Sequence, residues 1–268
     1  MIKIENVEVM GWEHAIRGMR NPKNSWEKSD SGFAYGVGDF CKDCPAPIFR
    51  DCPGSDEYYV GPNDHDLMSR LAKGGAVHAK YRRMITVYLD ITAPLYWWKE
   101  FDTYKVGTVA NSCSTMHKIH AKEFTLEDFS CEHLCNKHND LDVMGELCDE
   151  LGYFTSSPMD DLIGDIKKLN AYRTLYLKCD AKLKREDLTD SERKHVISQR
   201  KLWWWQMIQR LPSNYNQRRT IMLNYEVLTN IYESRKNHKL DEWRELCKWI
   251  ESLPYSEIIT GEVKEGDD

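Results

Sequence analysis

Three cysteines in a loop rich in glycine and proline have the spacing of a metal site. Cys41, Cys44 and Cys52 form a C-x2-C-x7-C pattern, and the last two each precede a proline. Structural zinc prefers thiolate and imidazole ligands, and a tetrahedral site needs four ligands or three plus water. The spacing predicts a zinc site whose fourth ligand comes from elsewhere in the chain. The alternatives for that ligand are His65, His78, or the later group Cys131, Cys135 and His138, which would share one face of a helix.

A second stretch, from His78 to His117, carries polar and nucleophilic residues that a strand and a helix must position. Ile85, Val87, Leu89 and Ile91 alternate with polar residues, which is typical of a half-buried strand and predicts one over 83–92. Proline suits the first turn of a helix, so the segment PLYWWKEFDTYK (94–105) is predicted to be helical.

The rest of the chain predicts an α+β fold, a twisted sheet with packed helices. Residues 1–10 alternate about a break at Glu5-Asn6, which suits a strand with a bulge or two short strands, and Pro22 must end the short helix that follows them. Residues 118–210 read as mainly helical, with a capping-box pattern from Thr125 to Asp128 and a helix start at Thr189 or Asp190. Residues 203–205 are three tryptophans that point in three directions around a helix, so at least one must be exposed or meet another subunit.

Composition and charge narrow the classes of function. The chain has 268 residues, and its 37 Lys and Arg against 43 Asp and Glu give a net charge of -6, which argues against general nucleic-acid binding. No run is long enough to span a membrane and no apolar signal core begins the chain, so a cytoplasmic protein is expected. In that compartment most of the nine cysteines are expected to be buried thiols and not disulfides.

Two ordered blocks resemble the flavin-dependent thymidylate synthases, also called thymidylate synthase complementing proteins. Residues 94–105 align without a gap with the segment that ends in the family's Arg-His-Arg signature, and residues 211–246 resemble a later block with a Leu-Pro turn and a helix. A weaker match is His14-Ala15-Ile16-Arg17, where the family tends to carry Ala-Ala-Arg. The counterparts in the later block are Leu211, Pro212, Thr220, Asn224, Arg235, His238, Glu242 and Arg244, with one residue of slippage between Arg235 and His238.

The chain departs from this family at its most specific motif. Thr103-Tyr104-Lys105 stands where the family has Arg-His-Arg, so two planar guanidinium groups are lost and one flexible cation remains. The family places a nucleotide-site serine seven residues later. Strict spacing puts Cys113 there, whereas a one-residue gap puts Ser114 there and Met116 where an arginine is expected.

The resemblance implies a homotetramer with nucleotide sites between subunits, a single domain over 1–260 and a function in dTMP biosynthesis. The domain would carry a Cys-containing loop at 31–63 and a helical insertion at about 118–205, with an acidic tail at 261–268. In the family, FAD takes a hydride from NADPH, and a one-carbon unit from methylenetetrahydrofolate is transferred to C5 of dUMP and reduced to methyl. Carried over by position, the flavin contacts would be His78, Lys105, Thr108, Asn224 and His238. The nucleotide contacts would be Cys113 or Ser114, Arg235, Arg210, Arg219 and Arg17.

Three functional interpretations follow. The first is a divergent thymidylate synthase that methylates dUMP or a related pyrimidine nucleotide, with a variant in which Cys113 acts covalently because a thiolate beside Lys105 is more reactive. The second is a catalytically inactive nucleotide-binding or protein-interaction module on the same fold, which accounts better for the altered signature. The third is a zinc-stabilised scaffold, which would unfold on chelation.

Overall fold

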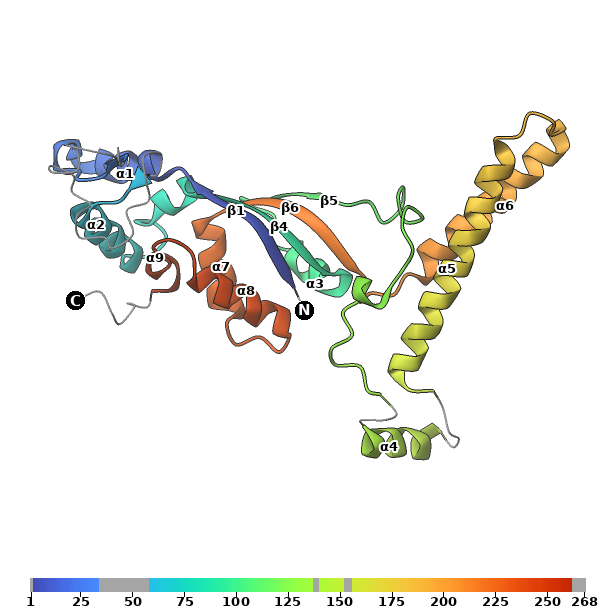
Figure 1. Ribbon diagram of the computed structural model, residues 1–268. Coiled ribbons are helices and arrows are strands. Elements are labelled where there is room, and N and C mark those ends of the chain that lie inside the picture. Colours follow the sequence, from blue (N-terminus) through green and yellow to red (C-terminus); the bar gives the residue numbers. More distant parts are fainter. Residues whose placement is uncertain (1, 34–57, 137–139, 152–155, 262–268) are drawn as a thin grey trace, which may run out of the picture. The chain divides into compact units, whose positions relative to one another are not determined.

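The computed structural model describes residues 2–33, 58–136, 140–151 and 156–261. The chain forms a four-stranded sheet in the order β1-β4-β6-β5, a short antiparallel ribbon of β2 and β3, and helices (Figure 1). The strands are β1 (Lys3–Met10), β2 (Gly32–Phe33), β3 (Tyr58–Tyr59), β4 (Thr86–Pro94), β5 (Val109–Ser112) and β6 (Asn216–Asn224). The α-helices are α1 (Trp12–Arg20), α2 (Pro62–Lys73), α3 (Leu95–Phe101), α4 (Leu141–Leu151), α5 (Pro158–Leu183), α6 (Asp190–Arg210), α7 (Tyr225–Arg235), α8 (Asp241–Glu251) and α9 (Glu257–Thr260). The predicted α+β class is confirmed.

The chain divides into two compact units. Unit 1 comprises residues 92–101 and 112–218 and holds helices α3 to α6; unit 2 comprises residues 2–91, 102–111 and 219–268 and holds β1, α1, α2 and α7 to α9. The interpretation of residues 1–260 as a single domain stays a prediction.

Strand β4 has the alternation that the sequence predicts. Val87, Leu89 and Ile91 are buried, whereas Tyr88 is 39% exposed. On the polar side, Asp90 accepts hydrogen bonds from Asn6 Nδ2 of β1 at 2.7 Å and from Thr220 Oγ1 of β6 at 2.5 Å. These contacts join three strands of the sheet within unit 2. The strand begins at Thr86, later than predicted, because residues 80–84 form a 3-10 turn.

Strand β1 is continuous over Lys3–Met10, so the alternative of two short strands is wrong. Asn6 has a φ of 52°, a left-handed conformation that asparagine tolerates better than most residues. The irregularity at Glu5-Asn6 is therefore taken up by one residue inside a single strand.

Helix α1 packs closely on the 3-10 turn of residues 80–84, and Gly11 makes the approach possible. A Cβ at Gly11 would lie 2.1 Å from the Met84 carbonyl oxygen, and Gly11 has a φ of 95°. Gly75 also has a positive φ, of 86°, but a Cβ there would meet nothing within 4 Å. An alanine at either position would suffer backbone strain, but only an alanine at Gly11 would also overlap with other atoms.

We expect Gly11→Ala to destabilise the protein more than Gly75→Ala. Both substitutions force alanine into the left-handed region, at a cost of about 1–2 kcal/mol. Only Gly11→Ala adds overlap with backbone, worth roughly a further 1–3 kcal/mol. Urea unfolding of both variants would measure the difference, and equal free energies of unfolding would contradict the expectation.

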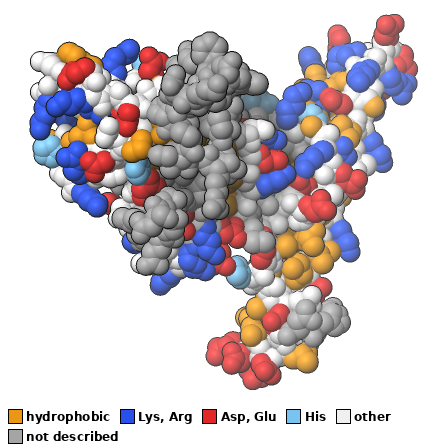
Figure 2. All heavy atoms as spheres, turned by 60° about the vertical axis from the view of Figure 1, so that its left-hand side comes forward, with side chains coloured by type: hydrophobic (Ala, Val, Ile, Leu, Met, Phe, Trp, Pro, Cys, Tyr) orange, Lys and Arg blue, Asp and Glu red, His pale blue; other side chains and the backbone are white. Residues whose placement is uncertain are grey.

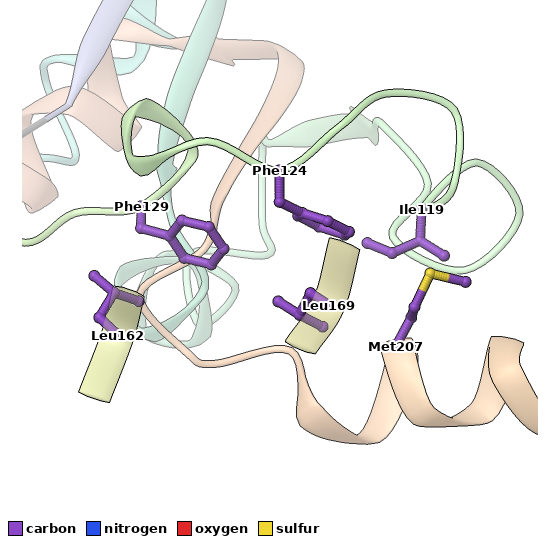
Figure 3. Packing of buried hydrophobic residues seen from close by; sticks show 6 residues of the cluster. All are labelled: Ile119, Phe124, Phe129, Leu162, Leu169 and Met207. Atoms are coloured by element: carbon purple, nitrogen blue, oxygen red, sulfur yellow. The ribbon is translucent and has the colours of Figure 1, made fainter. Parts of the chain in front are cut away.

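Unit 1 has an aromatic helix and a separate apolar cluster. In α3, Trp97, Trp98 and Phe101 are buried, and Trp97 and Trp98 lie 4.8 Å apart between ring centroids. Pro94 is the last residue of β4, so the helix begins one residue later than predicted and ends at Phe101. The cluster joins a loop to α5 and α6 (Figure 3), and its buried members are Ile119, Phe124, Phe129, Leu162, Leu169 and Met207.

The capping patterns of unit 1 are confirmed. Thr125 and Asp128 form a capping box, although it opens only a 3-10 turn over Leu126–Asp128. Thr189 is the N-cap of α6, and its side chain accepts from Glu192 N. At the other end of α6, Trp205 is 41% exposed, as the tryptophan triplet required.

The segment around Cys131 and Cys135 is not the predicted helix. Both residues precede α4 in irregular structure, and His138 lies outside the described residues. Asp140 explains the later helix start, because its Oδ2 accepts from Asn136 N at 2.8 Å and its carbonyl accepts from Met144 N at 3.0 Å. The prediction that a helix places Cys131 and Cys135 on one face is therefore wrong.

Candidate functional site

Unit 2 brings several of the predicted site residues to the two ends of α7. At its beginning, Asn224 is the N-cap, and its Oδ1 accepts from Val227 N at 3.1 Å. The loop before β5 comes close to this cap at Gly107, whose φ is 78°. A Cβ at Gly107 would lie 3.0 Å from Asn224 Nδ2 and 3.1 Å from Val227 Cγ2. A glycine is needed for this approach, and it places the neighbouring Lys105 and Thr108 on the same loop as the Asn224 contact.

Thr108 presents an unsatisfied polar group. Its Oγ1 is buried and has no hydrogen-bond partner within the described part of the chain. A buried hydroxyl without a partner costs free energy and calls for an unobserved water, ion or ligand. Lys105 on the same loop is exposed, and its backbone N–H bonds to the Thr103 carbonyl at 3.0 Å. The loop thus combines a cation in solvent with a hydroxyl whose hydrogen bonding is incomplete.

Arg235 ends α7 and lies among aromatic side chains. Its Nε donates to the Tyr104 hydroxyl at 3.0 Å, and its Cζ lies 4.7 Å from the centre of the Trp243 ring. The Tyr104 and Trp243 rings are 5.9 Å apart at 61°. An arginine fork held in a fixed plane is suited to binding paired oxygens of a phosphate or of a planar ring.

His238 belongs to the same neighbourhood. Its ring lies 6.3 Å from that of Trp243, and its Nδ1 accepts from Leu240 N at 3.2 Å. Because Nδ1 accepts, the neutral ring carries its proton on Nε2. Arg244 fixes the turn by donating to the His238 carbonyl at 2.8 Å.

The other predicted residues of unit 2 lie elsewhere on its surface or in ion pairs. Arg219 is bound to Asp102 at 2.6 Å. Arg17 is exposed on α1, 4.0 Å from Glu13. His78 is exposed and lines a separate groove of about 1290 Å³, together with Lys23, Lys28 and Lys80.

Solved structures identify the fold. A scan against protein-family models finds no match, and no curated protein matches in sequence. Thymidylate synthase X (ThyX) from Helicobacter pylori, crystallised with FAD and dUMP, matches over 98% of this chain and 98% of its own, with 15% identity and a TM-score of 0.51. A second ThyX structure from that organism, also complexed with FAD and dUMP, matches over 97% and 98%, with 15% identity and a TM-score of 0.53. The fold is that of the flavin-dependent thymidylate synthases.

On this fold, Cys113, Ser114 and Arg210 belong to unit 1. Cys113 is exposed, and its carbonyl accepts from Gln217 Nε2 at 2.7 Å. Ser114 Oγ accepts from His117 N at 2.8 Å and from Met116 N at 3.2 Å, so the hydroxyl closes a turn. Arg210 is bound to Asp165 at 2.7 Å. The choice between Cys113 and Ser114 as the counterpart of the family serine stays open.

Two residues of the neighbourhood were missed at the sequence level. Tyr104 enters the sequence analysis only as a member of the altered signature, and Trp243 does not enter it. The available signal for Trp243 is the helical spacing of apolar residues in α8, where Trp243, Leu246, Cys247 and Ile250 are buried at i, i+3, i+4 and i+7.

The predicted zinc site is untested. Cys41, Cys44 and Cys52 lie outside the described residues. Among the residues that are described, no group of three or more His, Cys, Asp or Glu side chains could hold a metal ion. Zinc therefore stays a prediction based on cysteine spacing.

The surface charge and the character of the helices are relevant to binding of nucleic acids and membranes. Among the described residues on the face that Figure 2 shows, basic and acidic side chains are interspersed. No helix in the described ranges has the length and apolar character to cross a membrane.

Proposed function

We propose that this protein is a divergent flavin-dependent thymidylate synthase that methylates dUMP or a related pyrimidine nucleotide. The observation that carries the proposal is the match over 98% of the chain to a ThyX structure that contains FAD and dUMP. The grouping of Asn224, Gly107 and Thr108 at one end of α7, with Arg235 and His238 at the other, supports it.

The residues fit a flavin in chemical type. Thr108 Oγ1 is a buried hydroxyl without a partner among the described residues, which a polar ring atom would satisfy. Lys105 is exposed and would neutralise a phosphate, and the Asn224 amide lies beside the Gly107 backbone. FAD, when bound, supplies the reducing chemistry, with NADPH and methylenetetrahydrofolate as co-substrates. The chain's own residues orient the ring and bind phosphate: Lys105, Thr108, Asn224, His238 and His78 toward flavin.

The nucleotide contacts follow the same proposal. Arg235 would bind the pyrimidine nucleotide through its guanidinium fork, with Arg219, Arg210 and Arg17 as further predicted contacts. Arg219 and Arg210 are already engaged by carboxylates in this structure, so each would have to exchange a partner to bind phosphate. Arg235 is the leading proposed contact because Tyr104 and Trp243 hold its guanidinium in place.

A second candidate is a nucleotide-binding module without catalysis. Thr103-Tyr104-Lys105 favours it, because one flexible cation stands where the family's signature has two arginines. Such a protein would bind dUMP but would not retain flavin or transfer a methyl group.

An absorbance titration with FAD separates the two. We expect the purified protein to retain flavin after gel filtration and to show the visible flavin bands. Lys105→Ala is expected to weaken FAD binding about tenfold, the cost of losing one charge-assisted contact. Lys99→Ala is the matched control, because Lys99 is also an exposed lysine but lies on α3.

The redox proposal fails if the protein, incubated with saturating FAD and then separated from free FAD by gel filtration, shows no flavin absorbance. Binding of dUMP without flavin would then favour the non-catalytic module. Retained flavin would be followed by assays for thymidylate with dUMP, methylenetetrahydrofolate and NADPH.

A further inference from the structure

We propose that Tyr104 and Trp243 form a clamp that positions the Arg235 guanidinium for binding the pyrimidine nucleotide. The proposal rests on the nucleotide-binding part of the proposed function. It assigns a role to Tyr104, which stands inside the segment where the family's signature is lost. Here a positioning residue is one that acts through Arg235 and does not itself touch the ligand.

The clamp holds Arg235 in two different ways. The Tyr104 hydroxyl accepts from Arg235 Nε at 3.0 Å, which fixes the rotation of the side chain. The Trp243 ring lies 4.7 Å from Arg235 Cζ, so the guanidinium rests on an aromatic face. The Tyr104 ring is also near, with its centre 5.8 Å from Cζ. The hydrogen bond to Tyr104 sets the direction of the Arg235 side chain, and the ring contacts set the plane of its guanidinium.

The two aromatic residues come from parts of unit 2 that are distant in the sequence. Trp243 is fully buried on α8, and Tyr104 lies 131 positions before Arg235 in the sequence. His238 and Arg244 fix the turn that joins α7 to α8, through the His238 contact with Leu240 N and the Arg244 contact with the His238 carbonyl. Arg235 and Trp243 are therefore held by two helices and their connection, and Tyr104 lies on the segment between α3 and β5.

Positioning matters because arginine is flexible. A free arginine side chain has several rotatable bonds, and holding it for a ligand costs conformational entropy. When the protein fixes the side chain in advance, binding does not bear that cost, and preorganisation raises affinity. A bidentate fork gains most, because both N–H groups must meet their oxygens at once. The loss of the Tyr104 hydroxyl should thus weaken nucleotide binding while Arg235 is still present.

Tyr104→Phe tests the clamp more cleanly than a change at Trp243. It removes one hydroxyl and keeps the ring, whereas Trp243 is fully buried and its removal would destabilise α8. Tyr232→Phe is the matched control. Tyr232 lies on α7, and its hydroxyl bonds to Glu251 Oε1 at 2.9 Å, so its loss removes a hydroxyl contact of the same helix that is made to a carboxylate and not to Arg235.

The measurement is the dUMP dissociation constant by calorimetry for wild type, Tyr104→Phe, Tyr232→Phe, Arg235→Ala and the double variant Tyr104→Phe/Arg235→Ala. We expect Tyr104→Phe to weaken binding about tenfold, or about 1.4 kcal/mol. Tyr232→Phe should stay within about twofold of wild type. In the Arg235→Ala background, Tyr104→Phe should have no further effect, because its role passes through Arg235. Thermal unfolding of both phenylalanine variants checks that the difference in affinity is not a difference in folding.

Two outcomes overturn the clamp while the proposed function stands. One is wild-type affinity in Tyr104→Phe, equal to that of the Tyr232→Phe control. The other is a full tenfold loss that persists in the Arg235→Ala background, which would mean that Tyr104 acts independently. If wild-type protein itself does not bind dUMP, the nucleotide-binding proposal and the clamp both fail.

Discussion

Replacing Asp64 by alanine is expected to lower the free energy of unfolding by about 3–5 kcal/mol, the usual cost of breaking a buried ion pair. Asp64 is fully buried in α2, and its partner Arg20 is 5% exposed at the end of α1. Arg20 Nε donates to Asp64 Oδ1 at 2.5 Å. Alanine at position 64 would leave the guanidinium buried without its counter-ion.

The carboxylate also organises the segment that follows α1. Its Oδ2 accepts from the hydroxyls of Ser29 at 2.6 Å and Ser31 at 2.7 Å. Arg20 in turn donates to the carbonyls of Ser25 and Lys28, at 3.2 Å and 3.0 Å. Burial raises the pKa of Asp64, but these hydroxyl and guanidinium contacts outweigh it and the net pKa lies below its usual value. The pair's contribution is therefore complete above the ordinary carboxylate pKa and is lost as the pH falls from there through the lowered pKa of the folded state.

Urea unfolding followed by tryptophan fluorescence at neutral pH measures the effect. Asp66→Ala is the matched control, because Asp66 lies on the same helix in an exposed pair with Arg70, where both side chains are about two-thirds exposed. That pair is worth no more than about 0.5 kcal/mol. Similar losses in the two variants would show that the buried network does not hold unit 2 together.

Periodicity and capping chemistry predicted the regular elements of this fold well. The alternation of Val87, Leu89 and Ile91 located β4, because burial on one face of a sheet imposes a period of two. Thr189 and Glu192 located the start of α6, because a capping box is a local interaction. Periodicity gave the wrong result where a helical spacing of residues and a later helix-start signal occur in the same segment. The segment around Cys131 reads as helical, yet Asp140 starts the helix nine residues later.

The candidate site was predicted only where the sequence resemblance reached it. Asn224 and Arg235 were located by the block from Leu211 to Leu246, and both lie at the ends of α7. The role of Tyr104 had no local signal, because it depends on a contact with a residue 131 positions away. Gly107 is similar, since its need for a positive φ arises from the approach to Asn224 and not from its neighbours in the sequence.

Arg235→Ala is expected to weaken dUMP binding about 100-fold. The guanidinium is the strongest candidate for binding the nucleotide, and losing a charge-assisted bidentate contact costs about 2–3 kcal/mol.

Arg235→Lys should restore only part of the affinity, because lysine is a point charge that cannot rest flat on Trp243 or donate through Nε to Tyr104. Arg70→Ala is the control, since Arg70 is an exposed arginine of α2 that pairs with Asp66 and has no part in the clamp. Calorimetry with dUMP gives the order wild type, Arg235→Lys, Arg235→Ala if the planar fork matters. Equal affinities for the lysine variant and wild type would show that charge alone is recognised, and an unchanged alanine variant would remove Arg235 from the nucleotide site.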